Sequence, residues 1–268
     1  MNSLEVTALN KVFGGLHAVR DMSFEVRKGA VHSLIGPNGA GKTTLINLIT
    51  GMYIPTSGRV TFESRDITGL APQKLPGHGM ARTFQNLQVC MNMSAVENVM
   101  VGAHLRQNTG LLAGLLSLPG LRAADRACRA DALDAMALAG ISVYAGAHAS
   151  QMPYGALKRL EIARALMTRP SMVLMDEPAA GLNPTETAEV GELIQRLAEQ
   201  GLTVLLVEHD MPLVMRISST ITVLNYGKKL AEGTPEEMRS HPEVIAAYLG
   251  AEVEEHAPLP AQAGRAPA

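Results

Sequence analysis

Strand-like patterns mark the start of the chain. Every second residue is apolar in the stretches 4–8 and 22–26, and a period of two predicts strands with one buried face. The run Val31–Ile35 follows a turn at Lys28-Gly29 and ends at Gly36, and we interpret it as a buried strand. A further short strand is expected at Arg59–Phe62.

Helices and strands alternate through much of the rest of the chain. We expect helices at Thr43–Thr50, Ala156–Thr168 and Thr185–Gln200, and strands at Ser171–Met175 and Leu202–Val207. Glycine or proline follows each of these helices and stops it. Because strands separated by helices usually pair in parallel, the pattern predicts an α/β domain with a mostly parallel sheet and helices on both faces.

Two segments depart from this alternation. Residues 94–146 are dominated by Ala, Leu and Met, and we expect several helices there, forming an insertion in the α/β body. The apolar run Leu111–Leu118 within it is far shorter than the roughly 20 residues of a membrane span, and we expect a core helix, with a patch that docks on a partner as the alternative. Residues 251–268 carry Glu and Pro with little apolar bulk, which predicts a disordered tail.

Composition narrows the classes of function. Of the 268 residues, 47% are hydrophobic and 18% are charged, which is ordinary for a globular protein. A net charge of −2 and an aromatic content of 3% offer neither the basic surface nor the stacking rings of a nucleic-acid-binding protein. Cys90 and Cys128 lack metal-site spacing and are expected to be reduced thiols, and we expect no secretory signal at the N-terminus.

One segment matches the phosphate-binding pattern GxxxxGK[ST] in full. It lies between an expected strand and an expected helix and reads Gly36-Pro37-Asn38-Gly39-Ala40-Gly41-Lys42-Thr43-Thr44. Such a loop wraps phosphate oxygens with backbone N–H groups, which requires small residues and unusual φ angles. Lys42 supplies charge for the β- and γ-phosphates, and the Thr43 hydroxyl is placed to hold Mg²⁺. A chance match in a turn is the alternative, and the strand–loop–helix context argues against it.

A P-loop enzyme also needs a carboxylate for its metal and a group that activates water. The apolar strand at 172–175 leads into Asp176 and Glu177, at the edge where open α/β sheets bind ligands. We assign Asp176 to Mg²⁺, directly or through water, and Glu177 as the candidate general base. Acidic residues often end strands, so this prediction depends on the P-loop.

Five further motifs follow in order along the chain, at Lys11–Gly15, Arg82–Gln85, Tyr154–Leu166, Ala179–Pro184 and Glu208–Asp210. With the P-loop, they make nearly all of residues 1–250 resemble the ATP-binding cassette (ABC) ATPases. Four features resemble, more narrowly, the LivG-type subunits of branched-chain amino-acid importers. They are the Tyr-Gly pair at 154–155, the sequence at 179–184, the insertion around 108–112 and the ending Val244–Gly250.

The resemblance implies a role for three single residues. Phe13 would stack on the adenine, with an ordinary core phenylalanine as the alternative. Gln85 would contact Mg²⁺ and the attacking water and would link the nucleotide to a membrane partner. His209 would sense the γ-phosphate and orient the water, whereas the other seven histidines are expected to be structural.

The resemblance also implies that one helix of the chain serves a second cassette. Tyr154, Gly155 and Ala156 begin this signature helix and would face the γ-phosphate held by the other cassette. Three residues depart from the usual pattern, because Pro153 stands where Ser is usual, Tyr154 where Gly is usual and Leu157 where Gln is usual. The departures bear on the partner's site and leave the chain's own P-loop intact.

The implied fold is a P-loop ABC cassette at 1–250, with a mostly parallel core sheet and an N-terminal antiparallel β-subdomain. A helical subdomain at about 86–165 would be inserted in its RecA-like core. The implied function is that of an ATPase, with ATP and Mg²⁺, which drives a branched-chain amino-acid importer. Cassettes of related importers for urea, amides or aromatic acids are the alternative, as are an exporter motor, an inactive regulator and a non-transport ABC ATPase.

The implied partners follow from the same resemblance. They are two transmembrane permease subunits and a second cassette, in a heterodimer within the complex or a homodimer in isolation. A periplasmic solute-binding protein would act indirectly, and no nucleic acid is involved. The chain would then be a peripheral protein on the cytoplasmic face of the inner membrane.

Overall fold

A six-stranded sheet forms the centre of the molecule in the computed structural model, which describes residues 2–104 and 119–255. The strand order is β10-β9-β3-β8-β7-β6. The strands are β3 (Val31–Ile35), β6 (Met80–Arg82), β7 (Met172–Asp176), β8 (Thr203–Val207), β9 (Thr220–Asn225) and β10 (Lys228–Gly233). All neighbours pair in parallel except β10, which runs antiparallel to β9. The mostly parallel α/β sheet expected from the sequence is therefore confirmed.

Both faces of this sheet are buried, which explains why its central strands β7 and β8 are mostly apolar. On β7, Met172 and Leu174 belong to the hydrophobic cluster that contains α1 (Lys42–Ile49) and the N-terminal strands. Val173 and Met175, which alternate with them, belong to the cluster on the opposite face. That second cluster includes α6 (Pro184–Glu199) and α5 (Tyr154–Leu166).

The N-terminal strands form a separate antiparallel sheet in the order β2-β1-β4-β5, as the resemblance implied. Its strands are β1 (Asn2–Phe13), β2 (Leu16–Arg27), β4 (Ser57–Phe62) and β5 (Arg65–Asp66). β1 and β2 form a hairpin in which Phe13 pairs with Leu16. This hairpin carries Phe13 to the end of its strand, next to the P-loop helix. The short helical turn η1 (Pro72–His78) then leads into β6.

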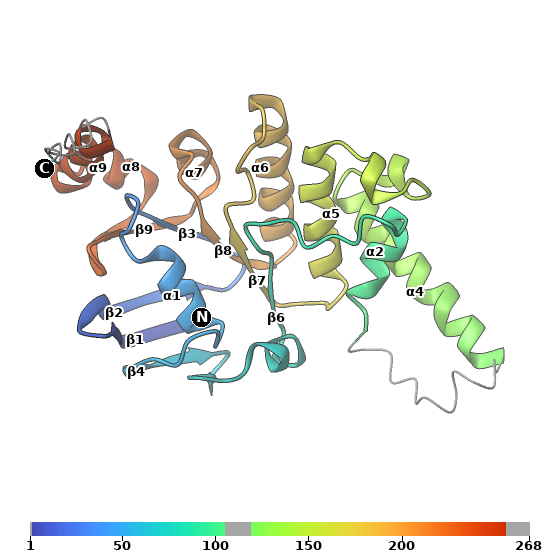
Figure 1. Cartoon of the computed structure of the whole chain (residues 1–268), viewed down its shortest axis with the longest axis horizontal. Coiled ribbons are helices and arrows are strands. Elements are labelled where there is room, and N and C mark those ends of the chain that lie inside the picture. Colours follow the sequence, from blue (N-terminus) through green and yellow to red (C-terminus); the bar gives the residue numbers. More distant parts are fainter. Residues whose placement is uncertain (1, 105–118, 256–268) are drawn as a thin grey trace, which may run out of the picture.

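Helices gather on the other side of the molecule and form the helical subdomain (Figure 1). They are α2 (Ala95–Val101), α4 (Pro119–Leu138), the short turns η2 (Ser142–Tyr144) and η3 (Ala149–Gln151), and α5. Val99 of α2 and Met136 of α4 lie in the same hydrophobic cluster as Leu160 of α5. Because this cluster continues onto the sheet, α5 joins the helical subdomain to the core. The core helix expected at 111–118 lies outside the described residues.

The chain ends in a group of helices beside β9. They are α7 (Met211–Ile217), α8 (Pro235–Ser240) and α9 (Pro242–Glu255), and Val244 of α9 packs with Ile35 and Val223 of the sheet. The helix continues past Gly250, where the sequence suggested that a tail begins. Residues 251–255 contain neither Gly nor Pro and are mostly Ala and Glu, which favour a helix. Residues 256–268 lie outside the described part.

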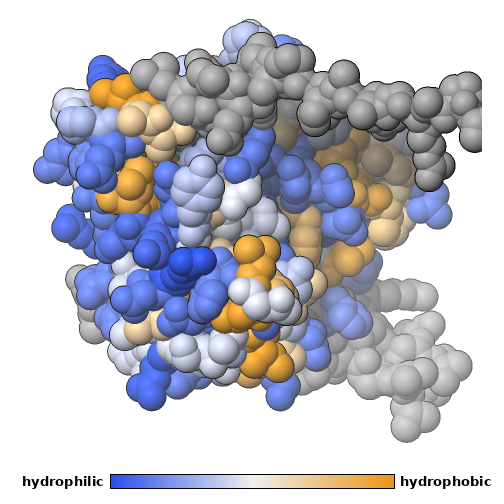
Figure 2. All heavy atoms as spheres, turned by 60° about the vertical axis from the view of Figure 1, so that its left-hand side comes forward, coloured by the Kyte–Doolittle hydropathy of each residue, from blue (hydrophilic) through white to orange (hydrophobic). Residues whose placement is uncertain are grey.

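One face of the surface shows how the exposed apolar residues are distributed on it. The face that is turned forward in Figure 2 is largely hydrophilic, with apolar residues in groups between the hydrophilic ones. Scattered apolar residues of this kind are normal on a globular protein. Among the residues that the structure describes, no helix is both long and apolar enough to cross a membrane.

Candidate functional site

The P-loop connects β3 to α1 and turns at glycines. Gly36, Gly39 and Gly41 have φ angles of 153°, 76° and 102°. A Cβ atom on Gly36 would lie 2.2 Å from the Leu224 carbonyl oxygen, and one on Gly41 would lie 2.7 Å from that of Ala18. Side chains are therefore excluded at these two positions, and the loop presents its backbone N–H groups instead.

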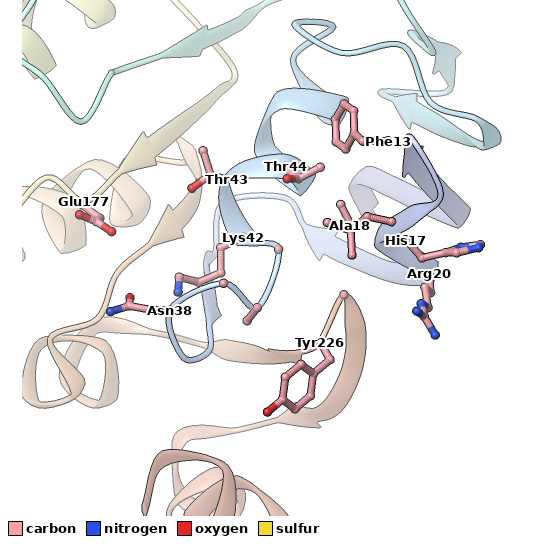
Figure 3. A pocket seen from close by; sticks show the side chains of 15 residues that line it. Phe13, His17, Ala18, Arg20, Asn38, Lys42, Thr43, Thr44, Glu177 and Tyr226 are labelled. Carbon is pink, nitrogen blue, oxygen red and sulfur yellow. The ribbon is translucent and has the colours of Figure 1, made fainter. Parts of the chain in front are cut away.

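A pocket of about 520 Å³ opens over this loop. Its lining includes the P-loop residues 38–44 together with Phe13 and Glu177, and Figure 3 shows these two on opposite sides of the loop. Sequence reasoning missed the other lining residues, which come from the β1–β2 hairpin and the β9–β10 turn: Leu16, His17, Ala18, Arg20, Tyr226 and Gly227. No motif marks them, because they reach the pocket only through the strand pairing.

Lys42 lies folded over the loop. It is 9% exposed, and its ammonium donates to the carbonyl oxygens of Gly36 at 2.6 Å and Pro37 at 3.1 Å. Burial lowers the pKa of Lys42, and the carboxylates of Glu177 and Asp176 oppose this. The next residue, Thr43, is exposed and lines the pocket. The loop thus places one cation and the hydroxyls of Thr43 and Thr44 at the start of α1.

Phe13 presents an aromatic surface at the side of the pocket away from Glu177. The ring meets Tyr53 edge-on, with 5.3 Å between centroids, and the Lys11 ammonium lies 4.8 Å from its centroid. Lys11 in turn donates to the carbonyl oxygen of Ile54 at 2.7 Å. Phe13 remains 40% exposed, so its ring is held by neighbours but is accessible to a planar ligand.

Gln85, Glu177 and His209 come together at the edge of the sheet. The Gln85 amide nitrogen donates to Oε2 of Glu177 at 2.7 Å. Nδ1 of His209 lies 3.9 Å from Oε1 of Glu177 and 3.9 Å from Oε2 of the buried Glu208. Glu177 itself has a φ of 49°, which is unusual for a residue with a side chain and is typical of functional positions.

Asp176 is held by a partner that the sequence did not suggest. Its Oδ2 accepts from Arg82 at 3.0 Å, and Arg82 also donates to Asn47 at 2.8 Å and Thr50 at 2.9 Å. Burial raises the pKa of Asp176, and the Arg82 guanidinium opposes this rise. Arg82 ends β6 beside the acidic end of β7. That adjacency of strand ends was the only signal in the sequence that could have indicated the ion pair between Arg82 and Asp176.

The signature residues lie apart from the P-loop pocket. Tyr154, Gly155 and Ala156 begin α5 after Pro153, which provides no side-chain cap, and none of the three lines that pocket. The Tyr154 ring packs against Gly181, since a Cβ there would lie 3.2 Å from it. Tyr154 is 45% exposed and faces solvent in the single chain.

Asn183, in the motif Ala179–Pro184 that follows β7, has a structural role. Its side chain accepts from the backbone of Glu186 at 3.0 Å, and the Glu186 side chain accepts from the backbone of Asn183 at 3.1 Å. This capping box begins α6. Asparagine is among the residues that best cap the start of a helix, so it satisfies the helix end here.

Two family models match the chain. The model described as "ABC transporter" matches residues 19–180. The model described as "Branched-chain amino acid ATP-binding cassette transporter" matches residues 228–254, which include β10, α8 and most of α9. The first match covers more than half of the chain.

Curated relatives match over nearly their whole length. The high-affinity branched-chain amino acid transport ATP-binding protein BraF of Pseudomonas aeruginosa is 47% identical over 248 residues, which are 92% of this chain and 97% of BraF. LivG of Escherichia coli K12, described in the same words, is 45% identical over the same shares.

Solved structures agree on the fold. The ADP conformation of MJ1267, an ATP-binding cassette of an ABC transporter, has a TM-score of 0.81 at 33% identity and covers 93% of this chain and 99% of its own. A nucleotide-free ATP-binding cassette has the same TM-score at 34% identity, covering 92% and 99%. The chain therefore belongs to the ABC transporter family, as an ATP-hydrolysing cassette of the group that includes BraF and LivG.

Proposed function

We propose that this cassette drives the uptake of branched-chain amino acids by hydrolysing ATP beside separate membrane subunits. The observation that carries the proposal is the meeting of Gln85 with Glu177 at the rim of the P-loop pocket. It joins a candidate water-activating carboxylate to the segment that leads into the helical subdomain. The transport role of BraF and LivG supplies the solute class.

The pocket fits a nucleoside triphosphate in size and in chemistry. About 520 Å³ is within the range of small-molecule sites. Backbone N–H groups of the loop and the start of α1 would hold the phosphates, with Lys42 beside them. Phe13, at the other side, would stack on the adenine, with Tyr53 at its edge. Arg20 and Tyr226 line the same pocket and are available to the nucleotide.

Mg²⁺ fits the donor set as a partly hydrated ion. Among the described residues, no cluster of three or more His, Cys, Asp or Glu side chains forms a protein cage for a metal. Mg²⁺ usually keeps several waters and takes only one or two carboxylates from the protein, together with substrate phosphates. The Thr43 hydroxyl, one oxygen of Asp176 and the Gln85 side chain would supply the protein ligands. When bound, the ion would neutralise charge that develops on the phosphates.

Glu177 would take the proton from the attacking water. Its Oε2 accepts from Gln85 and its Oε1 faces His209, so the carboxylate is oriented from two sides. The positive φ of Glu177 fixes the backbone that presents it. His209 would sense the γ-phosphate, and Gln85 would pass the state of the site to the helical subdomain.

A second cassette would complete the site. Because Tyr154, Gly155 and Ala156 lie outside the chain's own pocket, they would serve the P-loop of a neighbouring cassette, in a heterodimer or in a homodimer of the isolated chain. Two permease subunits would dock near Gln85 and the helical subdomain. The cassette would then lie at the cytoplasmic face of the inner membrane, with the solute-binding protein on the other side.

The first experiment compares ATP turnover by the purified chain with that of Glu177→Gln. We expect the variant to bind ATP with unchanged affinity and to turn it over at least about 100-fold more slowly, because general-base catalysis contributes this much. Glutamine keeps the volume and the contact with Gln85, so a folding defect is not expected. Uptake of leucine by vesicles that hold the complete complex then tests the solute class.

Two outcomes would overturn parts of this proposal. A folded chain that fails to bind ATP would remove the central claim. Equal turnover by wild type and Glu177→Gln would remove the role of Glu177 while leaving the cassette assignment. If the chain alone is inactive, the comparison is repeated in the assembled complex.

A further inference from the structure

The signature helix α5 carries charged side chains on its buried side. Lys158 and Glu161 are each 3% exposed, and Arg164 follows at the same helical spacing. Burying a charge is unfavourable unless it is paired or hydrogen-bonded. The contacts of these residues therefore show what the helix is built to hold.

All three residues hold the segment 85–88, which follows β6. The Lys158 ammonium donates to the carbonyl oxygen of Gln85 at 2.8 Å. The backbone N–H of Gln88 donates to Oε1 of Glu161 at 2.6 Å, and Arg164 donates to the carbonyl oxygen of Gln88. Arg164 also lies 3.5 Å from Glu161. The motif Arg82–Gln85 is the Q-loop of the family, so we call Lys158, Glu161 and Arg164, with the backbone of Gln85 and Gln88, the Q-loop clamp.

Lys158 has a second contact, on its own helix. Its ammonium lies 5.7 Å from the centroid of the Tyr154 ring, within the range of a cation–π interaction. One buried ammonium thus touches the carbonyl of Gln85 and the ring of Tyr154. The other end of Gln85, its side-chain amide, reaches Glu177 at 2.7 Å.

We propose that Lys158 is a positioning residue that fixes Gln85, in the chain's own ATP site, relative to Tyr154, in the motif that serves the neighbouring cassette. The inference rests on the proposed function, because the roles of Gln85 and Tyr154 belong to it. A movement of α5 relative to the core is transmitted through Lys158 to the carbonyl of Gln85, and from there to Glu177. The two ATP sites in a pair of cassettes are therefore linked through one side chain in each.

The test compares three variants of the full chain. Lys158→Met removes the ammonium but keeps the length and the packing of the side chain. Lys158→Arg keeps a cationic donor for Gln85 and a cation over Tyr154. Arg159→Met is the matched control, because Arg159 lies next along the same helix but pairs with Glu189 of α6 at 3.1 Å.

Two readouts separate positioning from stability. Steady-state kinetics should show kcat about tenfold lower for Lys158→Met, with the KM for ATP within about twofold of wild type, because the contact orients a catalytic group and does not bind nucleotide. Hydrogen exchange should show the Gln88 amide exchanging about tenfold faster, since local opening of the clamp exposes it. Lys158→Arg should have the kcat and the Gln88 exchange rate of wild type, and Arg159→Met should change neither quantity.

Several results would overturn the inference. Unchanged exchange at Gln88 in Lys158→Met would show that Lys158 does not hold the segment. Faster exchange with an unchanged kcat would make the contact purely structural. Equal effects in Arg159→Met would make them non-specific. If wild type does not hydrolyse ATP even in the assembled complex, the proposed function fails first, and exchange at Gln88 still decides whether Lys158 holds the segment.

Discussion

The P-loop cradle and the Q-loop clamp both hold a short segment beside the nucleotide pocket, and they do so by opposite means. In the cradle, backbone meets backbone, and Gly36 and Gly41 leave no room for a Cβ atom. In the clamp, long side chains of α5 cross to the backbone of Gln85 and Gln88. A site that is built from backbone atoms requires glycines at a fixed spacing in the sequence. A site that is built from side chains requires ordinary charged residues that the fold brings to the right position.

The largest expected effect comes from a Cβ atom in the cradle. In Gly36→Ala, the new atom would lie 2.2 Å from the carbonyl oxygen of Leu224, in a backbone conformation that alanine rarely adopts. The loop must shift, and we expect a loss of ATP affinity of more than about 100-fold. Nucleotide titration measures the affinity, and circular dichroism checks that the chain still folds.

Gly39→Ala is the matched control for the cradle. Gly39 also has a positive φ, of 76°, but a Cβ atom there would meet nothing within 4 Å. Only the conformational strain remains, which is about 1 kcal/mol, so we expect a loss of affinity of about tenfold or less. Equal losses in the two variants would show that close backbone contact is not what shapes the cradle.

The second effect comes from removing the buried acid of the clamp. Glu161→Ala leaves the Gln88 amide and Arg164 without their carboxylate partner, and we expect the free energy of unfolding to fall by about 3 kcal/mol. Urea denaturation measures the change. Glu189→Ala, which breaks an ion pair on the more exposed side of the helix, should change stability by less than about 1 kcal/mol.

A small decrease in the free energy of unfolding of Glu161→Ala would contradict the account of the clamp. It would mean that water satisfies the freed groups, so that the contacts of α5 with segment 85–88 are replaceable. In that case the difference between the cradle and the clamp would be one of rigidity as well as of construction.

The cradle could be predicted from the sequence because a closely packed backbone loop requires glycine at particular positions. Glycine at 36, 39 and 41 before Lys42, between a strand and a helix, leaves few other interpretations. The parallel sheet was predictable for a similar reason, since apolar strands such as Leu202–Val207 alternate with helices. Asp176 and Glu177 followed from their place at a strand end.

The clamp could not be predicted because no local rule selects its residues. A lysine and a glutamate three apart on a helix are usually a solvated ion pair, and only the packed structure places Lys158 and Glu161 inside. The partnership of Arg82 with Asp176 is similar, because it joins the ends of two strands far apart in the sequence. The helix α9 runs past the expected boundary at Gly250 for a local reason, since the residues after Gly250 favour a helix.

The smallest expected effect tests whether the strand behind the cradle also depends on a side chain. His32 of β3 is 2% exposed and lies 2.8 Å from the Thr222 hydroxyl, with Phe24 packed against its ring. Burial, helped by the nearby charge of Lys229, lowers the pKa of His32 from 6.5 to about 4. Below pH 6.5 the unfolded chain takes up this proton before the folded chain does. The stability contributed by neutral His32 is therefore complete above pH 6.5 and is lost as the pH falls toward 4.

Between pH 7 and pH 5, this histidine should account for a loss of about 2 kcal/mol in the free energy of unfolding. Urea denaturation at both pH values should show a drop that is smaller by this amount in His32→Gln, because glutamine does not titrate. His17→Gln, at an exposed position on the pocket rim, should keep the full drop of wild type. If His32→Gln also shows the full drop in the free energy of unfolding between pH 7 and pH 5, the strand tolerates a charged imidazole. The cradle would then depend on its backbone alone, which would make its contrast with the clamp complete.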